Sequence, residues 1–260
     1  MIHPTALVHP TAVLSQGVHV GAYSIVEEGV TVAAGASLAE HVVVRAGVSI
    51  GAGCKLDSYA VVGGQPQMHG DRVWAGAVHV GEGTILREGV TISRPTRPDG
   101  ATTVGDGCML MANSHVGHDC AVADGVTLAN NVMLAGHVVV GEGTFLGGGV
   151  GVHQFVRIGG RAMVGGNASI SYDVPPYAMA AERNELRGLN LVGIRRLKLA
   201  PAAVSDLKRS YHAVYAGPGD YRVRAADALR GGACGSEAPG RAFLEFFVGG
   251  ERGFVRPPSR

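Results

Sequence analysis

Residues 105–140 read GDGCML MANSHV GHDCAV ADGVTL ANNVML AGHVVV when divided into groups of six. Each group ends on Val or Leu, and its fourth residue is Cys, Ser or Val. The register extends in both directions, because 25 of the 28 positions spaced six apart from Val8 to Ile170 are Val, Ile or Leu. The three exceptions are Met68, Trp74 and Pro98. Two residues before each of the 25 positions the side chain is always small or β-branched, which defines an internal repeat.

Six residues of this kind form one short strand and a turn, and three of them close a triangular coil. The aliphatic side chain points into the coil, and the small residue two positions earlier fits beside it. Parallel pairing of strands stacks successive coils about 4.8 Å apart. We therefore predict an all-β left-handed parallel β-helix of about nine coils over residues 1–187, followed by a C-terminal α-helical domain over residues 188–260.

Two segments interrupt the repeat and are predicted to be loops. Residues 63–79 and 93–103 are rich in Gly, Pro and other turn residues, and the period resumes in phase after each. Loops on a rigid scaffold often carry binding residues. In the tail, helical spacing predicts a helix over residues 188–215 and further short helices around 221–230 and 240–248.

Composition and charge limit the classes of function. Aromatic residues make up only 5% of the 260 residues while glycine accounts for 41, which favours a repetitive fold packed from small side chains. The net charge of +1 argues against a nucleic-acid partner. Residues 181–260 carry 14 Lys/Arg and 8 Asp/Glu, a net charge of +6, so the rest of the chain carries −5. The basic tail indicates either an acidic partner or a solvated helical surface rich in Arg.

The four cysteines show no C-x-x-C pair. Cys54, Cys108 and Cys120 fall on the small inward position of the repeat, so we interpret them as buried packing residues, while the pattern assigns no role to Cys234. The N-terminus lacks the pattern of a signal peptide, and no stretch approaches the roughly 20 apolar residues of a membrane span. We expect a cytoplasmic protein with reduced thiols and no membrane span.

Four of the eleven histidines lie on neighbouring coils of the second half of the repeat, and none occupies an inward position; they are His115, His118, His137 and His153. His118 is followed by Asp119, and a carboxylate can fix the tautomer of an imidazole and stabilise its charged form. Such a histidine can act as a general base, typically a ~10²–10⁴-fold effect. Zinc held by histidines between subunits is the alternative. We expect no metal, because His115 and His118 lack the His-x4-His spacing of the β-helix carbonic anhydrases.

Several segments of the chain together resemble bacterial UDP-N-acetylglucosamine acyltransferase, which performs the first step of lipid A biosynthesis. They are residues 113–120, 128–131, 134–137, 152–155, 163–166 and 173–177. The resemblance covers nearly the whole chain. The repeat alone is weakly specific, whereas the order of the histidines together with the tail segment 190–196 is much more specific.

The resemblance implies an O-acyltransferase that forms a homotrimer with active sites between subunits. It implies a 3-hydroxyacyl chain carried on the phosphopantetheine of acyl carrier protein, so that no further cofactor is needed, and a UDP-amino sugar as acceptor. Acyl carrier protein is strongly acidic, which matches the basic tail.

The resemblance also assigns roles to individual residues. His118 would deprotonate the sugar 3-hydroxyl, Asp119 would orient His118, and the N–H of Gly136 would stabilise the oxyanion. The residues implied to bind the sugar and the acyl donor are Gln67, His115, His137, His153 and Gln154. Gly166 would lie along the acyl groove. The residues implied to approach the uridine and diphosphate are Asn190, Arg195 and Arg196.

The chain departs from the family pattern in two places. The family loop reads close to Gln-Asp-Leu-Lys-Tyr, but here Met68, His69, Gly70 and Asp71 follow Gln67. A donor without the 3-hydroxyl, or a 3-amino sugar as acceptor, is therefore an alternative. The family also has an acidic residue two positions after the asparagine of the tail, where this chain has Val192.

Three other classes of protein share parts of this pattern. The later N-acyltransferase of the same pathway carries a uridine-binding domain before its β-helix, whereas the repeat here begins by Ala6. Coenzyme-A-dependent sugar acetyltransferases rarely carry so long a helical tail. A catalytically degraded trimeric scaffold would explain the altered loop, but the pair His118 and Asp119 argues against it.

Overall fold

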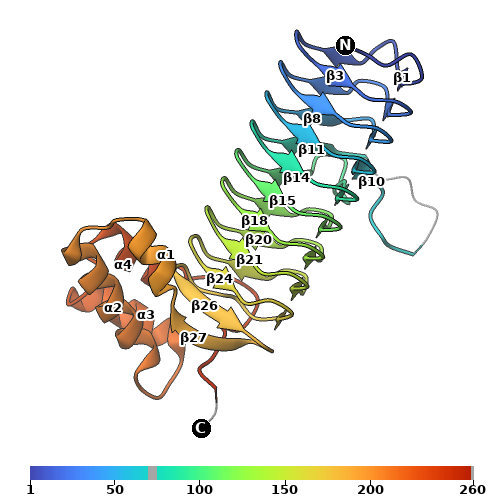
Figure 1. Ribbon diagram of the computed structural model, residues 1–260. Coiled ribbons are helices and arrows are strands. Elements are labelled where there is room, and N and C mark those ends of the chain that lie inside the picture. Colours follow the sequence, from blue (N-terminus) through green and yellow to red (C-terminus); the bar gives the residue numbers. More distant parts are fainter. Residues whose placement is uncertain (70–74, 259–260) are drawn as a thin grey trace.

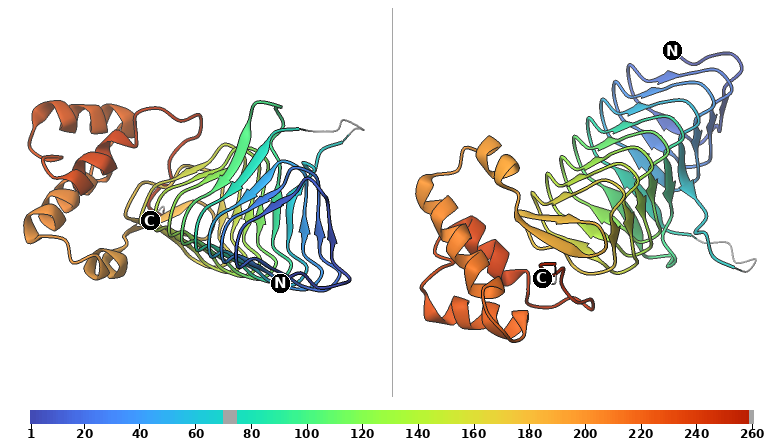
Figure 2. Two further views of the ribbon diagram at one scale, coloured as in Figure 1. Left: turned by 90° about the horizontal axis from the view of Figure 1, so that it is seen from above. Right: turned by 60° about the horizontal axis from the view of Figure 1, so that its bottom comes forward.

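The computed structural model describes residues 1–69 and 75–258 as an elongated prism of stacked coils with a group of helices beside one end (Figure 1). Seen from above, the coils have a triangular outline (Figure 2). One sheet runs along each face of the prism. Neighbouring strands are parallel except for the last pair of sheet 3, β26 and β27.

The sheets are named here by the order in which the chain visits them. Sheet 1 consists of β1 (Leu7–Val8), β4 (Ile25–Val26), β7 (Val43–Val44), β10 (Val61–Gly64), β13 (Thr91–Ser93), β16 (His115–Val116), β19 (Met133–Leu134), β22 (Gly151–Val152) and β25 (Ser169–Ile170). Sheet 2 consists of β2 (Val13–Leu14), β5 (Thr31–Val32), β8 (Val48–Ile50), β11 (Ala77–Val80), β14 (Ala101–Val104), β17 (Ala121–Val122), β20 (Val139–Val140) and β23 (Arg157–Ile158). Sheet 3 consists of β3 (His19–Val20), β6 (Ser37–Leu38), β9 (Lys55–Leu56), β12 (Ile85–Leu86), β15 (Met109–Leu110), β18 (Thr127–Leu128), β21 (Phe145–Leu146), β24 (Met163–Val164), β26 (Ala178–Ala181) and β27 (Glu185–Leu189).

The number of coils agrees with the prediction. Strands β1–β24 make eight coils of three strands, and β25, a bridge from Ile158 to Val174 and β26 complete a ninth. The protein is the predicted left-handed parallel β-helix with a C-terminal helical part.

The predicted register is confirmed by burial. Aliphatic residues eighteen apart pair across coils, as Val116 does with Leu134, and both are fully buried. Cys54, Cys108 and Cys120 are buried beside them. Burial raises the pKa of the Cys120 thiol to about 12, so this thiol stays protonated and unreactive.

Up to residue 258, the tail contains four helices, which are α1 (Leu191–Arg196), α2 (Pro201–Tyr215), α3 (Tyr221–Gly231) and α4 (Ala238–Glu245). The prediction of one helix over residues 188–215 is wrong. Strand β27 continues to Leu189, with Gly188 at a φ of +112°, and α2 begins only at Pro201. Pro201 suits the first turn of a helix because it lacks an N–H donor. Cys234 lies in the core that these helices share with Phe243.

The two loops are shorter than predicted, because strands extend into both ends of each. They span residues 65–76 and 94–100, and residues 70–74, including Trp74, Gly70 and Asp71, lie outside the described residues. Among the helices that the structure describes, none combines the length and apolar character required to cross a bilayer.

Replacing an inward residue should destabilise the prism far more than replacing its outward neighbour. Leu128 is fully buried, so Leu128→Ala should lower the free energy of unfolding by about 2–5 kcal/mol. Thr127→Ala, on the outward side of the same strand, should cost less than about 1 kcal/mol. Urea unfolding followed by circular dichroism measures both; equal losses would contradict the inward register.

Candidate active site

Both loops and several polar side chains gather at one edge of the prism, where sheet 1 passes into sheet 2. The loop of residues 65–76 leaves between β10 and β11, and that of residues 94–100 leaves between β13 and β14. Asp119, His137 and Phe155 occupy the same corner on the next three coils. We call this corner the loop edge.

The corner residues of the loop edge share a left-handed backbone. Asp119, His137 and Phe155 have φ values of 58°, 60° and 64°, a region that glycine, asparagine and aspartate enter most readily. Because they stand eighteen residues apart, their side chains lie one above another. The rings of His137 and Phe155 stack with centroids 4.5 Å apart, and the ring of His118 meets that of His137 edge to face at 5.1 Å.

Asp119 binds the ring of His118 directly. The Nδ1 atom of His118 lies 2.9 Å from Oδ2 of Asp119. A carboxylate only accepts hydrogen bonds, so Nδ1 of His118 carries the proton and Nε2 is left as the basic nitrogen of the neutral ring. His137 adds a longer contact, with Nε2 3.7 Å from the same oxygen.

The second loop holds Asp119 from outside the repeat. The backbone N–H and the hydroxyl of Thr96 both donate to Oδ2 of Asp119, at 3.0 and 2.8 Å, and the N–H of Asp119 donates to Thr102. Burial raises the pKa of this carboxyl, but the hydrogen bonds from His118 and Thr96 outweigh burial, so the net shift is downward. Asp119 is therefore ionised at neutral pH and can stabilise a positive charge on His118.

Gly136 leaves the space that the ring of His118 fills. A Cβ atom built at Gly136 would lie 2.3 Å from Cε1 and 2.4 Å from Nε2 of His118. Any residue other than glycine at this position would thus displace the imidazole. In the described part of the chain, no group accepts a hydrogen bond from the backbone N–H of Gly136. This donor is therefore available beside Nε2 of His118.

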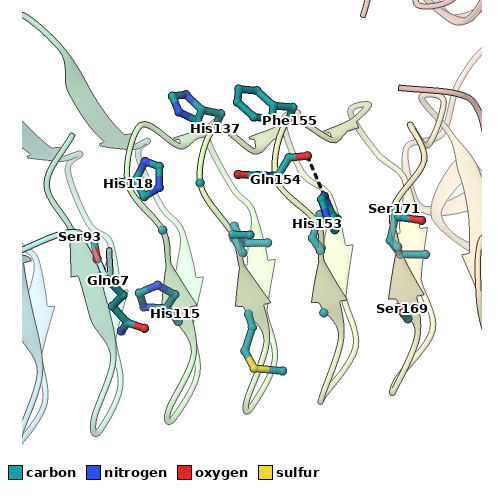
Figure 3. A pocket seen from close by; sticks show the side chains of 18 of the residues that line it. Gln67, Ser93, His115, His118, His137, His153, Gln154, Phe155, Ser169 and Ser171 are labelled. Carbon is teal, nitrogen blue, oxygen red and sulfur yellow. Dashed lines mark hydrogen bonds between the residues drawn. The ribbon is translucent and has the colours of Figure 1, made fainter. Parts of the chain in front are cut away.

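A groove of about 1210 Å³ runs along sheet 1 at the loop edge (Figure 3). Burial, with a smaller effect from His118, lowers the pKa of His115, whose Nδ1 lies 2.8 Å from the hydroxyl of Thr91. The residues of the sequence-based site that line the groove are Gln67, His115, His118, Gly136, His137, His153 and Gln154. The structure therefore brings these predicted residues together, with Asp119 bonded behind His118.

Four other predicted site residues lie elsewhere in the chain. Gly166 lies in the turn between β24 and β25, at the opposite edge of sheet 1 from the loop edge. Asn190 caps α1, since its Oδ1 accepts from the N–H of Gly193 and its Nδ2 donates to the carbonyl of Arg161. Arg195 lines a separate pocket of about 350 Å³ with Lys198 and Lys208, and Arg196 is exposed on α1. A single chain does not place these residues in the groove of the histidines.

Sequence reasoning missed three residues of this site. Phe155 could have been found, because it follows Asp119 and His137 at the same spacing of eighteen. Thr96 lies in a loop outside the repeat, and Arg252 reaches His153 from the C-terminus, so the period gives no signal for either.

The atoms of His118, Asp119 and His137 that could coordinate a metal ion all lie within 4.8 Å of one another. Two imidazoles and a carboxylate suit several metals. However, Oδ2 of Asp119 already accepts from His118 and twice from Thr96. A cation there would have to replace these hydrogen bonds. The expectation that no metal takes part stays a prediction.

A hexapeptide-repeat prism with a histidine–carboxylate pair in an outer groove suits an acyltransferase, and the comparisons show that class. Residues 101–136 match the family model "Bacterial transferase hexapeptide (six repeats)", and residues 173–255 match "Udp N-acetylglucosamine O-acyltransferase; Domain 2". The chain is 39% identical over 260 residues to the acyl-[acyl-carrier-protein]--UDP-N-acetylglucosamine O-acyltransferase of Paraburkholderia phymatum, covering 98% of this chain and 99% of that protein. It is 40% identical over 265 residues to the Xanthomonas oryzae enzyme of the same name, covering 98% of each.

Solved structures agree as well. The UDP-N-acetylglucosamine acyltransferase from Campylobacter jejuni superposes with a TM-score of 0.91 at 31% identity, covering 99% of this chain and 100% of that one. LpxA from Acinetobacter baumannii superposes with a TM-score of 0.93 at 33% identity, covering 98% of this chain and 99% of that one. The chain belongs to the UDP-N-acetylglucosamine O-acyltransferase family and is an acyltransferase.

Adding a single methyl group at Gly136 should abolish acyl transfer without unfolding the protein. Gly136→Ala forces the ring of His118 to move, whereas Gly148→Ala, at the same position of the repeat, places its Cβ 3.4 Å from the nearest atom. We expect a loss of at least about 10²-fold for Gly136→Ala, the scale of displacing a general base, and near-normal rates for Gly148→Ala. Initial rates and thermal unfolding of both variants check this; equal activities would show that His118 needs no such space.

Proposed function

We propose that the protein transfers a 3-hydroxy fatty acyl chain from acyl carrier protein to the 3-hydroxyl of UDP-N-acetylglucosamine, the first step of lipid A biosynthesis, with His118 as general base. The names of its relatives include both the acyl carrier protein and the UDP-sugar. The observation that carries the mechanism is the contact of His118 with Asp119, which leaves Nε2 basic beside the groove.

The proposed reaction needs one proton shuttle and one anion-binding donor. Nε2 of His118 takes the proton of the sugar hydroxyl as its oxygen attacks the thioester carbonyl, and Asp119 stabilises the resulting imidazolium. The N–H of Gly136 binds the oxyanion of the tetrahedral intermediate, a donor of a kind whose loss costs roughly 10²–10³-fold in other enzymes. The intermediate then expels the phosphopantetheine thiolate, which receives the proton back from His118. The proposed reaction uses no cofactor beyond the phosphopantetheine of the carrier protein.

The first loop gives a specific reason to keep a second candidate. Gln67 and Met68 both line the groove, and Met68 stands where the family loop has an acidic residue. A thioether accepts hydrogen bonds weakly, so Met68 cannot bind a hydroxyl or an amino group as a carboxylate would. Transfer of a chain without the 3-hydroxyl, or transfer to a 3-amino UDP-sugar, is therefore the second candidate.

A homotrimer with sites between subunits is part of the proposal. The groove is open along sheet 1, and Met133, which lines it, is 54% exposed in the single chain. Large apolar side chains exposed on a prism face suit contact with a neighbouring subunit. A neighbour could then supply Gly166 for the acyl groove and Asn190, Arg195 and Arg196 for the uridine and diphosphate.

The basic tail supports the proposed carrier. Arg195, Lys198 and Lys208 line one small pocket on the helices, and residues 181–260 carry a net charge of +6. An acidic carrier protein would be attracted to such a surface. A cytoplasmic location completes the proposal, supported by the four cysteines, all of which are unpaired.

A transfer assay tests the proposed function. Purified protein is incubated with UDP-N-acetylglucosamine and a panel of acyl carrier protein thioesters with and without a 3-hydroxyl, alongside His118→Ala. We expect product with a hydroxyacyl donor and a loss of about 10²–10⁴-fold in the variant, with unchanged circular dichroism.

Each other outcome of this assay has a distinct meaning. Product only with plain acyl donors would favour the second candidate and link Met68 to donor choice. Product only with the 3-amino sugar would move the acceptor atom from oxygen to nitrogen. Activity abolished by a metal chelator would contradict the role of His118 as general base.

A further inference from the structure

The C-terminal end of the chain returns from the helices to the prism and packs against its last coils. We call residues 249–256 the C-terminal strap. The N–H of Asp173 donates to the carbonyl of Gly253 at 2.7 Å, and the N–H of Leu186 donates to that of Arg256 at 2.7 Å. Phe254 and Val255 are buried. The strap is thus an ordered part of the fold, with its backbone paired to the prism.

An ion pair whose carboxylate is fully buried anchors this end of the chain. Arg157 donates to the carboxylate of Asp173 at 2.7 Å, and its Nη2 donates to the carbonyls of Phe246 and Gly249 at 3.0 and 3.1 Å. The guanidinium of Arg222 donates to the carbonyls of Gly250 and Arg252. These contacts fix the backbone from which the side chain of Arg252 extends.

We infer that Arg252 is a positioning residue that holds His153 in the tautomer with the proton on Nε2, so that the groove receives an N–H donor at this point. The guanidinium of Arg252 bridges two acceptors at the loop edge. Its Nη2 lies 3.0 Å from Nδ1 of His153, and its Nε donates to the carbonyl of Gln154 at 3.2 Å.

The chemistry of the guanidinium decides the tautomer. Arginine is always protonated and can only donate, so Nδ1 of His153 must accept from it and the ring proton must lie on Nε2. Without Arg252 the preferred tautomer of His153 changes to the one with the proton on Nδ1. The reason is that Nδ1 also lies 3.3 Å from the carbonyl of Gln154, to which a protonated Nδ1 would donate (Figure 3). One guanidinium therefore selects between the two tautomers of a groove histidine.

The consequence for the site rests on the proposed function. In the described part of the chain, nothing accepts from Nε2 of His153, while the ring lines the groove. A fixed Nε2–H would donate to an oxygen of a bound substrate, such as an amide carbonyl, hydroxyl or phosphate oxygen. Asp119 imposes the opposite tautomer on His118, so the groove presents one basic nitrogen and one donor from two imidazoles.

Long-range ¹H–¹⁵N correlation spectra of the histidine rings test this inference without any substrate. The wild-type protein should show His153 with the proton on Nε2, assigned by comparison with His153→Gln. Arg252→Ala should move the proton to Nδ1, and Arg252→Lys, which can still donate to Nδ1, should restore the wild-type pattern. Arg256→Ala is the matched control, because the side chain of Arg256 on the same strap makes no hydrogen bond or ion pair within the described residues.

The kinetic arm separates positioning from folding. Arg252→Ala should raise the KM of the substrate that accepts from Nε2 of His153 about 10-fold, the scale of one hydrogen bond to a charged group, with little change in kcat. Arg256→Ala should leave both constants unchanged. A wild-type ring protonated on Nδ1, an unchanged tautomer in Arg252→Ala, or a changed tautomer with unchanged kinetics would each overturn the inference. If no donor gave product, the proposed function would fail while the spectra still decided the tautomer.

Discussion

The site depends on one constraint, which is that a coil uses eighteen residues wherever the repeat is uninterrupted. Parallel pairing then places residues i, i+18 and i+36 one above another, about 4.8 Å apart. Val116, Leu134 and Val152 form such a column inside the prism. Outside it, His118 and Gly136 occupy neighbouring levels of a second column, which explains why a Cβ at Gly136 would collide with the imidazole. The same spacing stacks His137 on Phe155.

The repeat fixes where the side chains stand, but segments outside the repeat influence the protonation of two of the groove histidines, His118 and His153. Thr96, from the loop of residues 94–100, donates twice to Asp119 and so helps to keep it ionised beside His118. Arg252, from the C-terminal strap, donates to His153. Neither contact comes from the repeat, since Thr96 lies in an inserted loop and Arg252 in the chain that returns from the helices.

The sequence allowed the prism to be predicted nearly residue by residue, because side chains at a fixed period have one inward direction. The buried cysteines and the outward histidines followed from the same register. The contacts of Thr96 and Arg252 could not be predicted, since tertiary packing alone decides where a loop and a terminus return. The single helix expected over residues 188–215 was wrong because local helical spacing does not reveal that β27 pairs with β26 as far as Leu189. Gly166, Asn190 and Arg195 stand outside the groove of their own chain, and the sequence pattern alone could not show this, because it gives no distances between the prism and the tail.

The central claim is that His118, with Asp119 behind it, is the general base, and the pH dependence of kcat/KM tests it most directly. The midpoint of the rising limb should coincide with the pH at which nuclear magnetic resonance shows the His118 ring half protonated in the free protein. In Asp119→Asn kcat/KM should fall over the whole profile, because the imidazolium formed in the reaction loses its carboxylate partner while asparagine still suits the left-handed corner. A kinetic midpoint that differs from the midpoint of the His118 titration, or an unchanged kcat/KM in Asp119→Asn, would contradict the account.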